Sequence, residues 1–415
     1  MSSTNIGHHH AATSHHRKEG GPVWLSAAAG LCASLVGLGL ARFAYTPLIP
    51  ALIAAKWFSP ADAVYLGAAN LAGYLAGALI ARELGARLGS VHALRGMMVL
   101  ASLCCFACSV PVSFIWFFGW RFLAGVTGGV IMVLAASTIL PHIAPGKRGL
   151  VGGVIFTGVG LGIAASGTLV PLLLQQGLRQ TWYGLGFLSV VLTLLSWWAW
   201  PTEVPATERT SDSHIPTRGR GLTIVRVLSA EYGLNALALV PHMVFLVDFV
   251  ARGLGQGITA GSHYWVLYGI GATAGPLLTG HLADRAGFGP ALRVAFLIEA
   301  IAILLPALSS APAAIIVSSL VVGGFTPGIV PLVLGRIHEL LPHSSANQRA
   351  AWAQATTTFA LFQAAGAYGL SYLFERTGGD YAILFVIGAG AVAASLAIDL
   401  ITALTIGRER KPSGA

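Results

Sequence analysis

The chain has 415 residues, of which 55% are hydrophobic and 9% are charged, and its formal net charge is +9. Soluble globular domains carry about 25% charged residues, so this composition excludes a soluble protein and predicts an all-α membrane protein with about a dozen spans. The basic residues are distributed between apolar segments instead of clustering on one element, which argues against a nucleic-acid partner.

The hydropathy pattern predicts twelve membrane-spanning helices in two groups of six. The first six are expected near 23–51, 62–85, 91–110, 112–140, 149–175 and 179–200. The second six are expected near 226–251, 261–283, 290–309, 312–340, 349–374 and 380–406. This predicts a disordered tail over 1–21, a first six-helix bundle over 22–201, a linker over 202–225, a second six-helix bundle over 226–407 and a tail over 408–415.

The two groups of helices repeat each other in sequence. Ile-Leu-Pro-His at 139–142 returns as Leu-Leu-Pro-His at 340–343, an offset of 201 residues, and each copy is followed by an arginine. Gly73 and Gly85 correspond to Gly275 and Gly287 at an offset of 202. Two pairs at nearly one offset, in matching loops, predict two parallel and pseudo-symmetric bundles.

Lysine and arginine are unevenly divided between the two ends of the expected helices. Eighteen lie on the side that holds both termini and the linker, four lie on the other side, and Arg42 and Arg121 lie inside spans. Because cytoplasmic loops are enriched in basic residues, we expect both termini and the linker in the cytoplasm.

Cysteine and histidine clusters indicate no metal or cofactor. Cys104, Cys105 and Cys108 fall within one apolar span, where small packing residues are the simpler interpretation than a soft-metal site. The histidines of the amino-terminal tail, including the run 8–10, could bind a transition metal, but Gly, Ser and Thr surround them and favour disorder. We therefore expect no metal and no cofactor.

The segment 37–50 places a permanent cation, Arg42, inside an apolar stretch. An arginine at the centre of a membrane helix costs about 3 kcal/mol on insertion scales, so it usually faces a bundle interior or a wet cavity. Arg121 has a similar position in the fourth expected helix. Two cations facing one aqueous space would favour an anionic group, although neutralisation within the protein, by backbone carbonyls or an acid, is the alternative.

Several motifs resemble the major facilitator superfamily (MFS), and the resemblance covers nearly the whole chain apart from its tails. The loop between the eighth and ninth helices reads Gly280-His-Leu-Ala-Asp284-Arg285-Ala-Gly287, which is similar to the gating loop Gly-x-x-x-Asp-Arg-x-Gly of that superfamily. In the first half the equivalent loop has alanine in place of the aspartate, so a latch there would use Glu83 or be absent.

Two helix motifs extend this resemblance. Arg121-Phe-Leu-Ala-Gly125 is similar to the fourth-helix motif, which the superfamily links with proton coupling, and the glycine run over 158–167 is similar to a fifth-helix motif found mostly in antiporters. Helix packing alone is the simpler explanation of the glycine run. The first-helix pattern over 39–50, Gly-x-x-Arg-Phe-x-Tyr-Thr-Pro-x-x-Pro, is similar to the signature of YbfB/YjiJ-like transporters.

The resemblance implies a secondary transporter in which two six-helix bundles rock about a cavity lined by helices one, four, seven and ten. It implies a multi-pass protein of the bacterial inner membrane that works as a monomer, with a small-molecule solute, protons and the lipid bilayer as partners. The expected function is proton-coupled transport of a small anionic or zwitterionic solute by alternating access. A proton-driven multidrug or metabolite efflux antiporter is the alternative.

Polar residues within the spans are candidates for the substrate and proton pathway. These candidates are Arg42, Tyr45, Arg121, Asn235, His242, Asp248 and Gln363. The alternative for the polar residues is a bond from helix to helix within the protein, and the alternative for Asp248 is a solvated charge at a helix end in the headgroup region. By the repeat offset Arg42 corresponds to Val244, one turn from Asp248, which predicts an Arg42–Asp248 gate that is paired when the outer side is closed. Glu299, in the middle of the ninth span, is expected to be protonated or bonded internally, and is a further proton-site candidate.

Other classes of function lack their required motifs. No nucleotide-binding glycine motif is present, which argues against ATP drive. An intramembrane enzyme would need a nucleophile with a base or a metal cluster, and neither occurs at workable spacing. A non-transporting sensor would be expected to carry a larger cytosolic domain than this linker.

Overall fold

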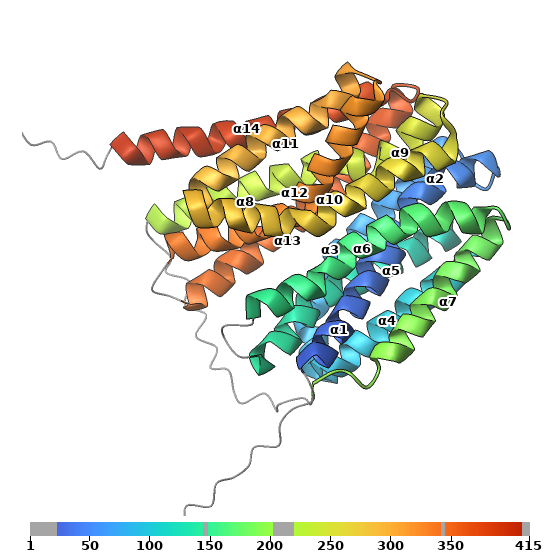
Figure 1. Ribbon diagram of the computed structural model, residues 1–415, viewed down its shortest axis with the longest axis horizontal. Coiled ribbons are helices and arrows are strands. Elements are labelled where there is room, and N and C mark those ends of the chain that lie inside the picture. Colours follow the sequence, from blue (N-terminus) through green and yellow to red (C-terminus); the bar gives the residue numbers. More distant parts are fainter. Residues whose placement is uncertain (1–22, 144–147, 202–219, 342–344, 409–415) are drawn as a thin grey trace, which may run out of the picture.

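The computed structural model describes residues 23–143, 148–201, 220–341 and 345–408. The amino-terminal tail with its histidines, most of the linker, the carboxyl-terminal tail and His343 lie outside the described residues. The described chain forms twelve spans, which confirms the predicted all-α architecture of two six-helix bundles (Figure 1). Nine of these spans are long and apolar enough to cross a membrane by length and composition alone.

The first bundle contains six spans, of which the first is built from three consecutive helical segments. These segments are α1 (Val23–Ser34), the π-helix η1 (Leu35–Phe43) and α2 (Tyr45–Ala54). The others are α3 (Pro60–Leu88), α4 (Ser90–Ala107), α5 (Phe114–Ile139) with the short η2 (Leu140–His142), α6 (Arg148–Leu174) and α7 (Leu178–Ser196).

The second bundle repeats this arrangement, and its first span is interrupted twice. That span consists of α8 (Arg220–Ala238), the π-helix η4 (Pro241–Phe245), α9 (Leu246–Asp248) and the π-helix η5 (Phe249–Gly253). The others are α10 (Gly257–Ala286), α11 (Phe288–Leu308), α12 (Pro312–Leu340), α13 (Ser345–Arg376) and α14 (Tyr381–Arg408).

Glycines set both the turns and the close helix contacts. Gly89 (φ 83°) and Gly287 (φ 81°) adopt backbone angles that L side chains rarely reach, and each ends one helix and begins the next. The turn glycine that matches Gly287 is therefore Gly89, one helical turn after the predicted Gly85. Along α6, Gly158 and Gly162 pack against the first span, whereas Gly160 and Gly167 pack against α10 of the other bundle.

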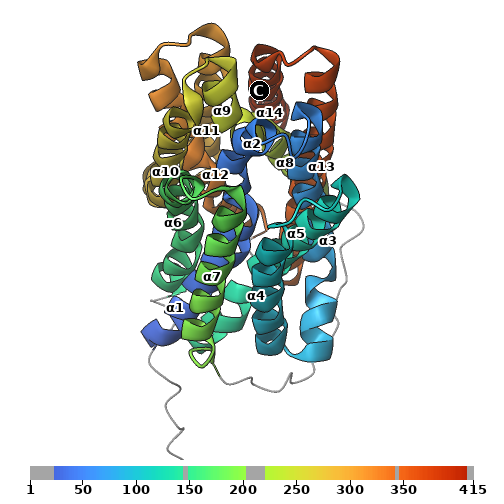
Figure 2. The same ribbon diagram turned by 90° about the vertical axis from the view of Figure 1, so that its right-hand side faces the viewer.

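The two bundles touch along two flanks and at one end. We call the end where α1 begins and α14 ends the terminal side, and the opposite end the distal side. The flanks are formed by α6 against α10 and by α3 against α13, and the distal contact by α2 against α9 and η4 (Figures 1 and 2). Across the terminal side, α5 is not packed against α12, nor α1 against α8, within the described chain. The described helices are thus packed together on the distal side and separated on the terminal side.

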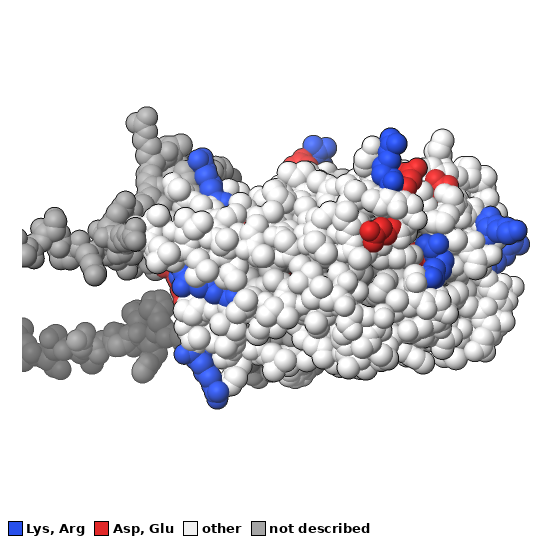
Figure 3. All heavy atoms as spheres, turned by 90° about the horizontal axis from the view of Figure 1, so that it is seen from above, with Lys and Arg blue, Asp and Glu red and all other residues white. Residues whose placement is uncertain are grey.

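Charged side chains on the surface lie mostly near the two ends of the spans. On the face shown in Figure 3, most Lys, Arg, Asp and Glu side chains lie toward the two ends, and the stretch between them is mainly uncharged. Large apolar side chains are exposed along the spans, among them Phe187, Leu195, Leu277 and Ile401. Such a band is what lipid tails require of a helical membrane protein.

Candidate functional site

The candidate site surrounds a break in the first span. η1 is a π-helix that ends at Phe43, and the backbone N–H of Ala44 donates to the carbonyl oxygen of Gly39. Gly39 lies against the backbone of Gly162, so the first span and α6 approach closely at this level. Pro47 and Pro50 follow within α2, where they lack backbone donors. π-helical turns often occur at functional sites, and this one places Arg42 at the boundary between the bundles.

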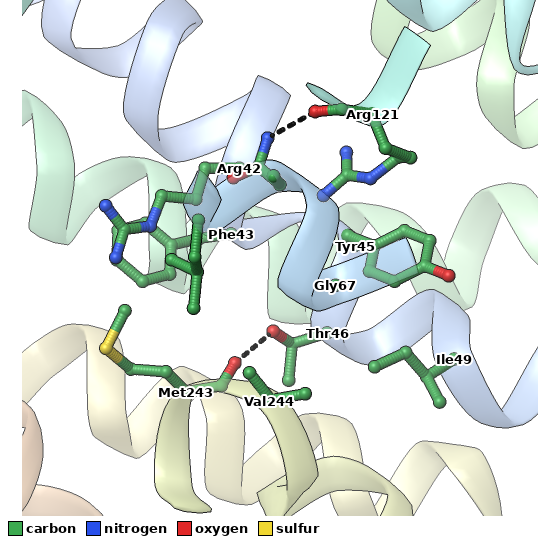
Figure 4. Close-up of a pocket in the computed structure, with 11 residues that line it drawn as sticks. Arg42, Phe43, Tyr45, Thr46, Ile49, Gly67, Arg121, Met243 and Val244 are labelled. Atoms are coloured by element: carbon green, nitrogen blue, oxygen red, sulfur yellow. Dashed lines mark hydrogen bonds between the residues drawn. The ribbon is translucent and has the colours of Figure 1, made fainter. Parts of the chain in front are cut away.

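A small pocket lies beside this break, between the two bundles (Figure 4). Its volume is about 20 Å³, which is room for about one water molecule. Both bundles contribute to the wall, the first through its first span, α3 and α5, and the second through η4. The lining residues are Arg42, Phe43, Tyr45, Thr46, Ile49, Gly67, Asn70, Leu71, Arg121, Met243 and Val244.

Arg42 crosses from the first bundle to the second. Its Nη2 donates to Oε1 of Gln363 on α13 at 2.7 Å. The guanidinium carbon lies 4.7 Å from the ring centre of Tyr74 and 5.0 Å from that of Phe43, and such cation–π contacts attract the charge without neutralising it. The residue is 8% exposed, and its Nε has no hydrogen-bond partner among the described residues.

Arg121 remains inside the first bundle. Its Nη1 donates to the carbonyl oxygen of Ala41 at 2.8 Å, and its guanidinium carbon lies 4.1 Å from the ring centre of Tyr45. The Asn70 amide donates to the Arg121 carbonyl oxygen at 3.1 Å. In Figure 4 the Arg121 guanidinium lies beside Tyr45, while that of Arg42 extends the other way, above Met243. Within the described chain, neither arginine has a carboxylate partner.

The distal closure next to this pocket is made by hydrogen bonds between the bundles. Thr46 Oγ1 donates to the carbonyl oxygen of Met243 at 2.6 Å (Figure 4), and Trp265 Nε1 donates to Oγ of Ser166 at 3.0 Å. Together with the bond from Arg42, they join the first span to η4 and α13, and α6 to α10. In each of these bonds the acceptor is neutral, so none of them is an ion pair.

The predicted Arg42–Asp248 pair is absent, although the side on which it was expected is closed. Asp248 is fully buried and is bound by Arg252, with a further bond of 2.6 Å from the hydroxyl of Tyr381 on α14. Arg252 follows Asp248 by four residues and therefore lies on the same helix face. The repeat offset placed Val244 at the level of Arg42, and both residues line the pocket. It did not predict the direction in which the Asp248 side chain points.

His242 and Asn235 bond within the second bundle and do not line this pocket. His242 Nε2 lies 2.7 Å from Oγ of Ser318, whose hydroxyl donates to the carbonyl oxygen of Ala302 at 2.6 Å. Because a hydroxyl has one proton to donate, His242 Nε2–H is the donor of this pair. Asn235 Nδ2 donates to Oε2 of Glu299 at 2.6 Å.

The loop that resembles the gating motif lies on the terminal side. Gly280 is near the end of α10, and Asp284 and Arg285 are exposed, with no ion pair to described residues. Gly287 ends α10, and the N–H of the next residue, Phe288, donates to Oε1 of Glu339 on α12 at 3.1 Å. The loop is therefore attached to its own bundle. In the first bundle, Glu83 pairs with Arg87 of the same helix at 2.5 Å.

The three clustered cysteines of α4 and its carboxyl-terminal end form no disulfide bond with one another. Cys104, Cys105 and Cys108 are buried free thiols. In the part of the chain that the structure describes, no three His, Cys, Asp or Glu side chains are grouped so that they could hold a metal ion.

Several residues of the site and its surroundings were not among the predicted ones. Tyr74 and Phe43 contact Arg42, Met243 accepts the bond from Thr46, and Trp265 and Tyr268 stack on each other at 4.9 Å between ring centres. The spacing of Trp265 and Tyr268, three residues apart on one helix face, could have indicated such a pair. The partners that come from other helices had no local signal in the sequence.

The fold and the sequence both have known counterparts. The crystal structure of a mutant of the nucleoside transporter NupG superposes with a TM-score of 0.73 at 14% sequence identity, and the match covers 91% of this chain and 99% of that one. At this identity the likeness shows a shared fold. No curated protein sequence matches the chain. A family model described as "Uncharacterised MFS-type transporter YbfB" matches residues 34–400. The protein therefore belongs to the YbfB-like family of MFS transporters, and it is a multi-pass membrane transporter with the MFS fold.

Proposed function

We propose that this transporter moves a small organic anion or zwitterion by alternating access, with Arg42 as the residue that binds the negative group. The observation that carries the proposal is a guanidinium at the bundle interface that is 8% exposed and has a neutral amide as its described side-chain acceptor. A buried charge is costly unless an opposite charge or several hydrogen bonds compensate it. A carboxylate of the solute would supply both.

Arg121 adds positive potential to the same site. It lines the same pocket as Arg42, and its own guanidinium contacts the ring of Tyr45 and donates to the Ala41 carbonyl oxygen. A second buried cation makes the region more favourable for an anion and less favourable for a cationic drug. For this reason we favour an anionic or zwitterionic solute over multidrug efflux.

Gln363 has a place in the transport cycle under this proposal. Its amide oxygen occupies the Nη2 donor of Arg42 across the interface. A solute carboxylate makes a stronger, charge-assisted bond to the same donor, so it would displace Gln363 and weaken the distal closure. Solute binding would thereby favour the change from the terminal-open to the distal-open conformation.

The positive-inside distribution of Lys and Arg supports placing the terminal side, with both termini, in the cytoplasm, and the described conformation then faces inward. The proposed location is the bacterial inner membrane, the proposed working unit is a monomer, and the proposed driving ion is the proton. We call the pocket that Arg42 and Arg121 line the arginine pocket. Asn235, His242 and Asp248 do not line it, so within this proposal they do not bind the solute and belong to the second bundle.

The experiment that tests the proposal is a thermal-shift screen on the purified full-length protein. Each carboxylic acid is paired with its uncharged amide, and amino acids, sugars, nucleosides and cationic drugs form the other arms. Ligand at 100 times its Kd stabilises the folded state by about 2.7 kcal/mol, which is a measurable shift. We expect acids to stabilise wild type and Arg82→Gln, whose arginine is exposed, but not Arg42→Gln. Stabilisation by cationic drugs alone would overturn the proposal.

A further inference from the structure

The second bundle buries an acid that the arginine pocket does not use. Glu299 lies in the middle of α11 and is fully buried. Its Oε2 accepts from Asn235 Nδ2 at 2.6 Å, and Asn235 is also fully buried. The other oxygens of the pair, Glu299 Oε1 and Asn235 Oδ1, have no hydrogen-bond partner among the described residues. Two buried acceptors thus lack a donor within one side-chain pair.

The titratable groups around Glu299 supply no cation at its level. On α10, the hydroxyl of Tyr268 is bonded to Thr326 of α12. On the span of Asn235, Glu231 lies one turn before it, and Arg226 lies more than two turns before it and is exposed. Further along this span, His242 is bonded to Ser318, and Asp248 is bound by Arg252 and by Tyr381 of α14. Arg336, His338 and Glu339 lie near the end of α12. Arg293 of α11 is paired with Asp399 of α14. An ionised Glu299 would therefore have one amide donor and no described counter-ion.

We infer that Glu299 and Asn235 form a proton-binding site, in which Glu299 Oε1 carries the proton and donates it to Asn235 Oδ1. A single proton gives both unpartnered oxygens a hydrogen bond, while Asn235 Nδ2 keeps its bond to Oε2. Glu299 takes the proton from water and returns it to water when the contact between the Asn235 and Glu299 side chains loosens. Asn235 is a positioning residue, because it holds the carboxyl group without exchanging the proton itself.

Aromatic contacts run from α10 of the second bundle to the first span, beside Arg42. Tyr268 of α10 is fully buried, and its hydroxyl is bonded to Thr326 of α12. It stacks on Trp265, which bonds to Ser166 of the first bundle and faces Phe43 with ring centres 6.1 Å apart. Loss of the proton would leave a charge in the second bundle that only rearrangement or water can compensate, so proton occupancy and bundle position are linked. The inference deepens the proposed function, on which it rests, by naming the group that carries the coupled proton.

The test is pH-difference infrared spectroscopy on the ligand-free, full-length protein in lipid, followed in the carbonyl-stretch region of protonated carboxyl groups. We expect a band from the protonated Glu299 that is lost in Glu299→Gln. Glu231→Gln is the matched control, because Glu231 is also buried within the second bundle, one turn before Asn235 on the same span. The band should remain in this control.

A second variant keeps the test decisive if Glu299→Gln fails to fold. Asn235→Leu removes the hydrogen bonds to the carboxyl group, so the Glu299 band should shift in frequency while persisting. A band unchanged by both Glu299→Gln and Asn235→Leu, or one lost in Glu231→Gln instead, would overturn the inference. Because no solute is present, this outcome is independent of whether acids stabilise the protein in the thermal-shift screen.

Discussion

The two bundles bury charged side chains of opposite sign, and they differ in the partners that they give to these side chains. The first bundle holds Arg42 and Arg121 with neutral partners. The second holds Asp248, which is paired with Arg252, and Glu299, which is bonded to an amide. The burial of a paired charge such as Asp248 needs no ligand, because Arg252 compensates it within the protein. The charges that lack an opposite partner are the ones that require an external ion, a solute for the arginines and a proton for the glutamate.

The largest expected effect is the loss of transport when the unpaired cation is removed. Arg42→Gln keeps a polar group at the interface but cannot attract a carboxylate, so we expect a loss of about 3 kcal/mol, or roughly 100-fold in affinity. Uptake of the best acid from the screen into proteoliposomes measures this effect. Arg82→Gln, on the exposed end of α3, should transport normally. Equal uptake by both variants would place the solute away from Arg42.

The second prediction concerns the paired acid of the second bundle. Asp248→Asn leaves Arg252 without its counter-ion, and because Arg252 is partly exposed, at 30% of its side chain, we expect a loss of about 2 kcal/mol in stability, which is less than for a fully buried ion pair. Thermal unfolding of the purified protein measures this. The affinity for the acid should change by no more than about twofold, which is less than 1 kcal/mol of binding free energy, because Asp248 does not line the pocket.

A large loss of affinity with unchanged stability would contradict this prediction and would favour a direct role for Asp248 in the pathway. The double variant Asp248→Asn with Arg252→Gln should recover part of the stability. Such a recovery shows that the cost came from the uncompensated charge.

The third prediction tests the competition at Arg42. Gln363→Glu places a carboxylate where the amide oxygen now accepts from Nη2 at 2.7 Å. Because charge-assisted bonds are about twice as strong as neutral ones, this internal anion should occupy Arg42 and weaken solute binding by roughly tenfold. Gln363→Leu, which removes the acceptor, should bind the acid at least as well as wild type. Calorimetric titration of both variants decides, and tighter binding in Gln363→Glu would exclude competition.

The smallest effect is expected at the surface pair of the first bundle. Glu83 and Arg87 are 2.5 Å apart, with side chains 65% and 75% exposed. Exposed pairs contribute about 0–1 kcal/mol, so Glu83→Gln should leave the unfolding temperature nearly unchanged. It should also leave uptake unchanged, because Glu83 is bonded within its own helix. A clear fall in uptake would show that Glu83 acts as a latch in another conformation.

Much of the fold was predictable because lipid imposes simple rules on sequence. Apolar runs predicted the twelve spans and their ends to within a few residues in most cases. The eighth span, α10, begins at Gly257 instead of near 261. α8 begins at Arg220, inside the segment expected to be linker. The repeat offset matched Gly85 to Gly287, but the glycine with the corresponding backbone angle in the first half is Gly89.

The site was predictable only in part, for a geometric reason. The cost of burying a charge indicated that Arg42 and Arg121 are special, and both line the pocket. The partner of Asp248 was predicted wrongly because π-helical turns in η4 and η5 change the direction in which side chains leave the helix. Gln363 was among the candidate residues, but its bond to Arg42 spans 321 residues of sequence and needed coordinates.

The central claim is that Arg42 binds the negative group of the solute. Its most direct test is calorimetric titration of wild type and Arg42→Gln with the best acid from the screen and with the amide of that acid. The claim predicts that wild type prefers the acid by roughly 100-fold, as expected for a lost charge-assisted contact of about 3 kcal/mol, and that the variant binds both compounds equally weakly. An undiminished preference for the acid in Arg42→Gln would contradict it.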